Sequence, residues 1–159
     1  MEYNKKVMEH FMKPKNVGEM KNADGIGKVG NMTCGDIMHV YIKVSKNKKG
    51  DEVLSEIKFQ TLGCAAAIAT SDVVIELAKG KTIKEALKIT NQDVVKELGG
   101  LPAVKVHCSL LSAEALGEAI YDYYKKSKKI IPKELEERHK KALMSEKSFH
   151  DKFKGGKCN

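Results

Sequence analysis

The spacing of apolar and polar residues divides the chain into a strand-forming part followed by a helix-forming part. Residues 37–44 and 53–62 alternate between the two kinds of position, with the period of two that is typical of strands. The polar run at 46–51 predicts a turn between them, so the two segments form an antiparallel hairpin. Residues 27–32, within a glycine-rich stretch, add a short third strand.

Other segments have the spacing and end signals of helices. Pro14 ends the first, glycines follow two others, and Thr82 opens a capping-box sequence. We expect helices at 2–12, 64–79, 82–89, 91–98 with Asn91 as its cap, and from 107 or 109 to 126. Pro102 disfavours helix at Leu101, which predicts an extended segment at 101–106. Strands before helices predict an α+β fold, in which a small antiparallel three-stranded sheet has helices packed on one face.

The last part of the chain differs from the rest in charge. Residues 1–124 carry 17 lysines and 16 acidic residues, whereas residues 125–159 carry 12 basic and five acidic residues. We therefore predict one domain at 1–126 and a basic extension at 127–159, with a helix at 132–144 and a flexible end.

The chain has no tryptophan and only nine other aromatic residues, so the extension lacks the stacking platform of single-strand binders. No nucleic acid is expected, although a nucleic-acid or acidic-partner binding module stays an alternative of another class.

Length and composition narrow the class of protein further. The 159 residues are 42% hydrophobic and 31% charged, as in a globular protein. No apolar run approaches the roughly 20 residues of a membrane span, so no membrane partner is expected. The N-terminus lacks an apolar signal segment, which predicts a cytoplasmic protein. In a reducing compartment the four cysteines are more typical of ligands or nucleophiles than of disulfides.

Three cysteines fall at junctions between predicted elements. Cys34 precedes the strand at 37–44, Cys64 opens the helix at 64–79, and Cys108 opens the long helix. The positive end of a helix dipole favours the thiolate of Cys64 and Cys108. With Asp36 and His107 they make five candidate ligands for a four-coordinate soft-metal site, and the surplus suggests ligand exchange. Zinc and an iron–sulfur centre both fit this ligand set.

The remaining candidates have simpler explanations. His10, His39, His139 and His150 have no cysteine or acidic partner at metal spacing, so we interpret them as structural or solvated. Cys158 lies between Lys157 and Asn159 near a glycine pair, which favours a bystander thiol.

Four motifs follow one another along the chain. They are His-Phe-Met-Lys-Pro-Lys-Asn-Val-Gly from His10, Val-Gly-Asn-Met-Thr-Cys-Gly-Asp from Val29, Thr-Leu-Gly-Cys from Thr61 with Ala-Ile-Ala-Thr-Ser from Ala67, and Leu-Pro-Ala-Val-Lys-Val-His-Cys-Ser from Leu101. In this order they resemble the motifs of the iron–sulfur cluster assembly scaffold family, the IscU type that also forms the N-terminal domain of NifU. The resemblance covers residues 1 to about 126.

The resemblance implies a scaffold or carrier rather than an enzyme. Such a protein accepts sulfur from a cysteine desulfurase, combines it with iron, holds a transient [2Fe-2S] cluster and passes it to apo-proteins. Carried over by residue, Cys108 is the persulfide acceptor, and Asp36 or His107 completes the iron ligands Cys34, Cys64 and Cys108. A dimer is implied when the cluster is bound, and zinc can occupy the same ligands.

Two departures and one close alternative accompany this resemblance. The family usually has a second proline where this chain has Ala103, within the segment Leu101, Pro102, Ala103, Val104 and Lys105 that an Hsp70-type chaperone and its J-type partner recognise. Ala65 replaces a glycine that many relatives have after the second cysteine.

The alternative is a SufU-like, zinc-dependent sulfur-transfer partner of a desulfurase. That group has an insertion between its second and third cysteines and lacks a histidine at the position of His107.

Overall fold

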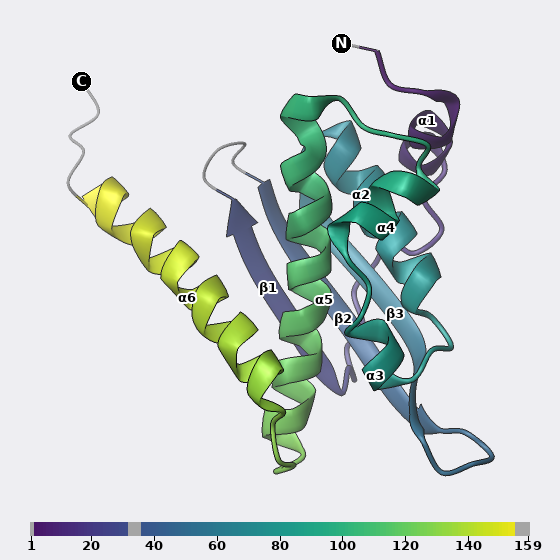
Figure 1. Cartoon of the computed structure of the whole chain (residues 1–159), viewed down its shortest axis with the longest axis vertical. Coiled ribbons are helices and arrows are strands. Elements are labelled where there is room, and N and C mark those ends of the chain that lie inside the picture. Colours follow the sequence, from purple (N-terminus) through teal and green to yellow (C-terminus); the bar gives the residue numbers. More distant parts are fainter. Residues whose placement is uncertain (1, 32–35, 155–159) are drawn as a thin grey trace.

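The computed structural model describes residues 2–31 and 36–154 and shows an α+β fold, as predicted (Figure 1). The three strands form one antiparallel sheet in the order β1-β2-β3, and α2 and α5 lie on one face of it. The elements are α1 (Lys5–Met12), β1 (Gly25–Asn31), β2 (Asp36–Lys46), β3 (Glu52–Leu62), α2 (Ala65–Ala78), α3 (Ile83–Ala86), α4 (Asn91–Glu97), a 3₁₀ turn (Ala103–Lys105), α5 (Val106–Lys126) and α6 (Lys133–Lys154).

The alternating pattern of β2 puts its apolar side chains into the core. Met38 and Val40 are buried, and Val40 pairs with the buried Phe59 of β3. A bulge between Lys43 and Val44 shifts the register of β3. Because the shift inserts one residue, Leu54 reaches the same core as Phe59 although an odd number of positions separates them.

Helix α5 lies directly on the backbone of β1, and two glycines allow this approach. A Cβ on Gly27 would stand 2.2 Å from the carbonyl oxygen of Ala115, and one on Gly25 would stand 2.2 Å from that of Ala119. Any larger residue would push the helix off the strand. The glycine-rich stretch is therefore a packing surface as well as a connection.

Two local predictions are wrong. Thr90, not Asn91, caps α4, because its hydroxyl accepts from the backbone N–H of Asp93 while the Asp93 carboxylate accepts from that of Thr90. The segment at 101–106 is extended only as far as Pro102. After it the chain turns at once, with the Lys105 N–H donating to the Pro102 carbonyl at 2.8 Å, and α5 begins at Val106.

The C-terminal helix α6 continues to Lys154, ten residues beyond the predicted end at Met144, and its first turns pack against the rest of the protein. Leu135 is buried in the main core. Arg138 donates to the carbonyl of Leu87 at 3.1 Å, and the ring of His139 stacks on Tyr121 and hydrogen-bonds Glu118 at 2.7 Å. None of the helices in the described ranges combines the length and hydropathy of a membrane span.

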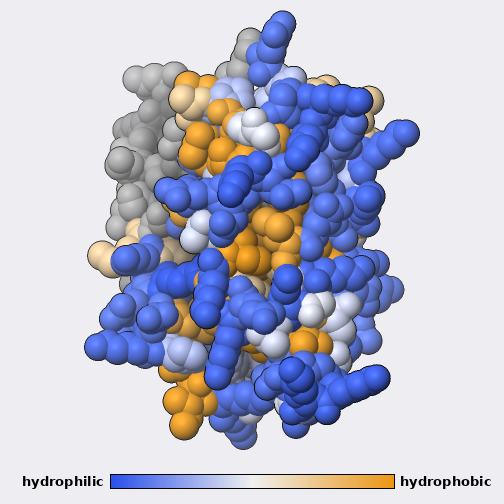
Figure 2. Space-filling model, turned by 45° about the vertical axis from the view of Figure 1, so that its right-hand side comes forward, coloured by the Kyte–Doolittle hydropathy of each residue, from blue (hydrophilic) through white to orange (hydrophobic). Residues whose placement is uncertain are grey.

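The surface is predominantly hydrophilic on the face shown in Figure 2, with apolar side chains gathered near its centre. Another apolar pair lies at one end of the sheet, where Ile37 and Leu62 are cross-strand partners and are 48% and 77% exposed. Leu62 is two residues before Cys64. Exposed apolar side chains therefore lie beside the end of the sheet that carries the candidate site.

Candidate functional site

The fold brings two of the predicted site cysteines into contact. Cys64 is the N-cap of α2 and Cys108 lies in the first turn of α5, and their sulfur atoms are 3.8 Å apart. Cys64 is partly exposed, whereas Cys108 is completely buried. Residues 44 apart in sequence thus form one thiol pair at two helix N-termini, where the helix dipoles stabilise negative charge.

The buried hydroxyl of Thr70 ties the two helices together beneath this pair. It lies on α2 and donates to the backbone carbonyl of Cys108 at 3.2 Å. The same hydroxyl also lies 3.2 Å from the carbonyl of Ala67, on its own helix. The position of the Cys108 backbone is therefore fixed relative to the helix that begins at Cys64.

A cation and a phenol border the thiols. Negative charge at the neighbouring Cys64 raises the pKa of the Lys105 ammonium. Burial raises the pKa of the Tyr3 hydroxyl, and the neighbouring Cys64 raises it further. Lys105 therefore stays protonated near neutral pH and stabilises negative charge on sulfur.

His107, in the first turn of α5, is a third candidate ligand beside Cys64 and Cys108. Its Nε2 atom is buried and has no hydrogen-bond partner within the described part of the chain. A buried polar atom without a partner costs free energy, so such atoms call for an explanation. A soft metal ion would satisfy this nitrogen, and imidazole together with thiolates is a ligand set that suits zinc or iron.

Three predicted residues cannot be placed in full. Cys34 and Cys158 lie outside the described residues. Of Asp36 the described part is the backbone, which begins β2 and pairs with Asn31. Asp36 therefore enters the sheet at the end of the β1–β2 ladder, and its role as a ligand stays a prediction.

The predicted partner-binding segment adjoins the site through Lys105. Its 3₁₀ turn exposes Val104, which is 63% accessible. Leu101 and Pro102 line a hollow of about 450 Å³ together with Glu2 and Asn4. Ala103 is exposed at the start of the turn. This segment can be contacted from solvent while the Cys108 side chain below it cannot.

A second cluster of titratable groups lies beside α1 and is structural. His10, which the sequence left as structural or solvated, hydrogen-bonds the buried carboxylate of Asp72 at 2.7 Å. The other oxygen of Asp72 accepts from the backbone N–H groups of Lys15 and Asn16 and from the Asn16 amide. Although Glu76 is near enough to complete a metal-binding trio, donors already occupy both oxygens of Asp72.

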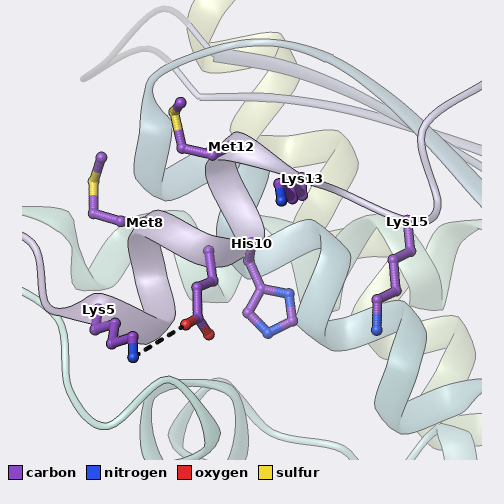
Figure 3. Close-up of a pocket in the computed structure, with 7 residues that line it drawn as sticks. Lys5, Met8, His10, Met12, Lys13 and Lys15 are labelled. Atoms are coloured by element: carbon purple, nitrogen blue, oxygen red, sulfur yellow. Dashed lines mark ion pairs between the residues drawn. The ribbon is translucent and has the colours of Figure 1, made fainter.

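Figure 3 shows this neighbourhood from the side of α1, where a hollow of about 530 Å³ follows the helix. Met8 and Met12 project to one side, and His10 points away from them. Three lysines line the hollow, and one of them, Lys5, pairs with Glu9. The positive lining and the occupied carboxylate both disfavour a cation here.

Sequence reasoning missed Tyr3 and Thr70 as neighbours of the thiols. Nothing in the local pattern at Tyr3 marks it, because the residue reaches the site only through the packing of the N-terminal segment. Thr70 lies six residues after Cys64, nearly two helical turns away. A polar residue within this apolar helix was the signal that could have indicated a buried hydrogen bond near the thiols.

The chain belongs to the family of NifU-like N-terminal domains, whose model matches residues 2–130. It is 54% identical over 145 residues to the iron–sulfur cluster assembly scaffold proteins IscU 1 and IscU 2 of Archaeoglobus fulgidus, an alignment that covers 87% of this chain and 92% of each relative. It is 45% identical over 129 residues to the corresponding IscU protein of Aquifex aeolicus, covering 81% and 80% of the two chains. The predicted family resemblance is therefore confirmed.

Solved structures show the same fold. A protein of Fervidobacterium islandicum, provisionally assigned as an iron–sulfur cluster assembly scaffold of the SUF system, superposes with a TM-score of 0.62 at 27% identity, over 74% of this chain and 96% of its own. The N-terminal part of a NifU-like protein from Brucella abortus gives 0.57 at 20% identity, over 77% and 94%. The chain is more similar in sequence to the IscU relatives than to the SUF-system protein. The zinc-dependent sulfur-transfer function and the nucleic-acid or acidic-partner binding function are therefore not favoured.

Proposed function

We propose that this protein is a scaffold on which an iron–sulfur cluster is assembled and from which it is passed on. One observation carries the proposal: Cys64 and Cys108 are in contact beside His107, whose buried Nε2 has no hydrogen-bond partner in the described ranges, in a chain 54% identical to two named IscU scaffolds. Thiolates and an imidazole on helix N-termini hold iron firmly enough to build a cluster. Ligands from separate elements also permit its release.

The cargo is a [2Fe-2S] cluster, with iron and sulfide as the incoming substrates. Cys34, Cys64 and Cys108 ligate iron, Asp36 or His107 completes the set, and Cys108 accepts the sulfane sulfur. A single oxygen or nitrogen ligand binds iron more weakly than a fourth thiolate would, which favours transfer. Zinc occupies the same ligands when iron is absent.

The partners follow from this chemistry. A cysteine desulfurase supplies the sulfur and apo-proteins receive the cluster. The exposed apolar pair Ile37 and Leu62 gives these proteins a surface beside the site. The segment from Leu101 to Lys105 is a contact for an Hsp70-type chaperone, and a second copy of the chain shares the cluster in a dimer.

Anaerobic reconstitution tests the proposal. The protein is incubated with ferrous iron, cysteine and a desulfurase, and absorption and Mössbauer spectra are recorded. We expect a [2Fe-2S] spectrum in the wild type and in Cys158→Ser, and its loss in Cys108→Ser. A colourless protein that keeps one zinc ion and accepts sulfur at turnover rates would instead indicate the zinc-dependent sulfur-transfer function.

A further inference from the structure

The two contacting thiols differ in their access to another protein. Cys108 has no exposed surface, and the hydrogen bond from Thr70 holds its backbone in place. Cys64 is partly exposed and lies two residues after the exposed Leu62. A large sulfur donor can therefore reach Cys64 without disturbing α5, whereas direct attack by Cys108 would require the first turn of α5 to open.

We propose that sulfur enters at Cys64 and is relayed from there to Cys108, an inference that rests on the proposed scaffold function. The Cys108 thiolate attacks the outer sulfur of a Cys64 persulfide. A new bond forms between this outer sulfur and the Cys108 sulfur, and its bond to the Cys64 sulfur breaks. Cys64 leaves as a thiolate and Cys108 becomes the persulfide. One sulfane sulfur changes partner, so no oxidant or reductant is consumed.

The two sulfur atoms are close enough for a direct exchange. They are 3.8 Å apart. A sulfur atom transferred in line between them is bonded to each in turn, so the path spans about two S–S bond lengths, or about 4.1 Å. The two helix starts therefore need only a small adjustment for the outer sulfur of a Cys64 persulfide to reach Cys108.

Two neighbouring residues assist the relay. Lys105 is near enough to Cys64 to interact with it electrostatically and stabilises the negative charge that the exchange leaves on this sulfur. Thr70 keeps the Cys108 backbone at a fixed distance from the helix that Cys64 caps. Thr70 acts through Cys108 and is a positioning residue.

The experiment follows a single turnover of a cysteine desulfurase loaded with cysteine, in the metal-free full chain. Samples are quenched in time, alkylated and analysed by peptide mass spectrometry, in a Cys34→Ser/Cys158→Ser background. We expect persulfide first on Cys64 and then on Cys108. Cys108→Ser should accumulate persulfide on Cys64, and Cys64→Ser should slow labelling of Cys108 at least tenfold. Serine is a favoured N-cap residue, so Cys64→Ser keeps α2 intact.

Thr70→Val separates the two steps. It keeps the shape of the side chain but loses the hydroxyl, and it should slow the second step several-fold while leaving the first unchanged; Thr70→Ser should restore the wild-type rate. Ser71→Ala is the matched control, because the buried Ser71 hydroxyl bonds Ala67 and Met38 but not Cys108.

Three results would overturn the relay. They are labelling of Cys108 before Cys64, labelling of Cys108 at the wild-type rate in Cys64→Ser, and a species 2 Da lighter that forms with release of sulfide, which would indicate a disulfide. Cluster reconstitution of the wild type is measured in parallel. If the cluster forms although Cys108 is labelled directly, the relay is wrong and the scaffold function stands.

Discussion

The polar side chains at the C-terminal end of α5 find partners within the chain, whereas at its N-terminal end the buried His107 Nε2 has none among the described residues. Asp122 accepts from the Ile26 N–H and pairs with Lys126, and the Tyr123 hydroxyl donates to Glu52. At the other end two thiols face each other and the buried His107 Nε2 has no partner in the described structure. One end of the helix is complete as folded, and the other is suited to a ligand from outside.

This difference locates function along a single helix. The satisfied end gains its stability from folding and should respond little to metal. The unsatisfied end gives up some stability in the metal-free protein and regains it on binding. Substitutions along α5 should therefore separate into those that change folding stability and those that change metal-dependent stability.

The largest effect is expected in the middle of α5, where the helix lies against Gly27 of β1. Gly27→Ala places a Cβ 2.2 Å from the Ala115 carbonyl oxygen and should lower the free energy of unfolding by about 3 kcal/mol or more, through overpacking. Urea unfolding measured by circular dichroism tests this. Gly50→Ala is the control. Its site is open and its φ is +82°, so it should cost only about 1 kcal/mol. Equal losses in the two variants would show that α5 does not depend on this close approach.

A smaller effect is expected at the unsatisfied end. His107→Ala should change the metal-free stability little, because removing the buried Nε2, which has no partner among the described residues, offsets the packing that the ring loses. Zinc at about 100 times its Kd should stabilise the wild type by about 2.7 kcal/mol. The variant should lose at least ~1.4 kcal/mol of this gain, equivalent to a tenfold weaker Kd. Thermal unfolding with and without zinc measures both quantities, with His39→Ala as the control. Full zinc stabilisation of His107→Ala would remove His107 from the ligand set.

Beyond the middle of α5 the opposite is expected, namely a loss of folding stability that does not depend on zinc. His139→Ala removes the hydrogen bond to Glu118 and the stacking on Tyr121, whose ring centroid is 3.7 Å away. We expect a loss of about 1 kcal/mol, of the same size with and without zinc. Parallel denaturation curves in zinc and in chelator provide the measurement. A loss that depended on zinc would mean that the two ends of α5 are coupled.

The smallest effect concerns Glu114, between the two ends. Burial raises the pKa of its carboxyl above the ordinary 4.5, the Arg138 guanidinium opposes this, and Glu118 adds to it. The folded state therefore holds the proton more tightly, and ionisation of Glu114 costs stability at neutral pH. Glu114→Gln should raise the free energy of unfolding by about 0.5 kcal/mol at pH 7. The gain should disappear as the pH falls below 4.5, and a gain that persisted there would assign it to packing.

The sequence predicted most of this architecture because period-two alternation and helix end signals are local. It placed Cys64 and Cys108 at helix starts for the same reason. It could not predict their contact, because α2 and α5 meet through long-range contacts such as the bond from Thr70 to the Cys108 carbonyl. It also missed the partners of His10 and His139, because Asp72 and Glu118 are far from them in sequence and meet them only in the folded chain.

The carboxylate of Asp72 links the stability of two segments that lie far apart in sequence. It accepts from the backbone N–H groups of Lys15 and Asn16 and is hydrogen-bonded to the His10 ring. If α1 detached alone, a buried carboxyl group would lose these partners, which is far costlier than the fraying of an ordinary surface helix. Helices α1 and α2 should therefore open together, and in native-state hydrogen exchange the amides of Lys15 and Asn16 will behave as members of the same cooperative unit as the core helix.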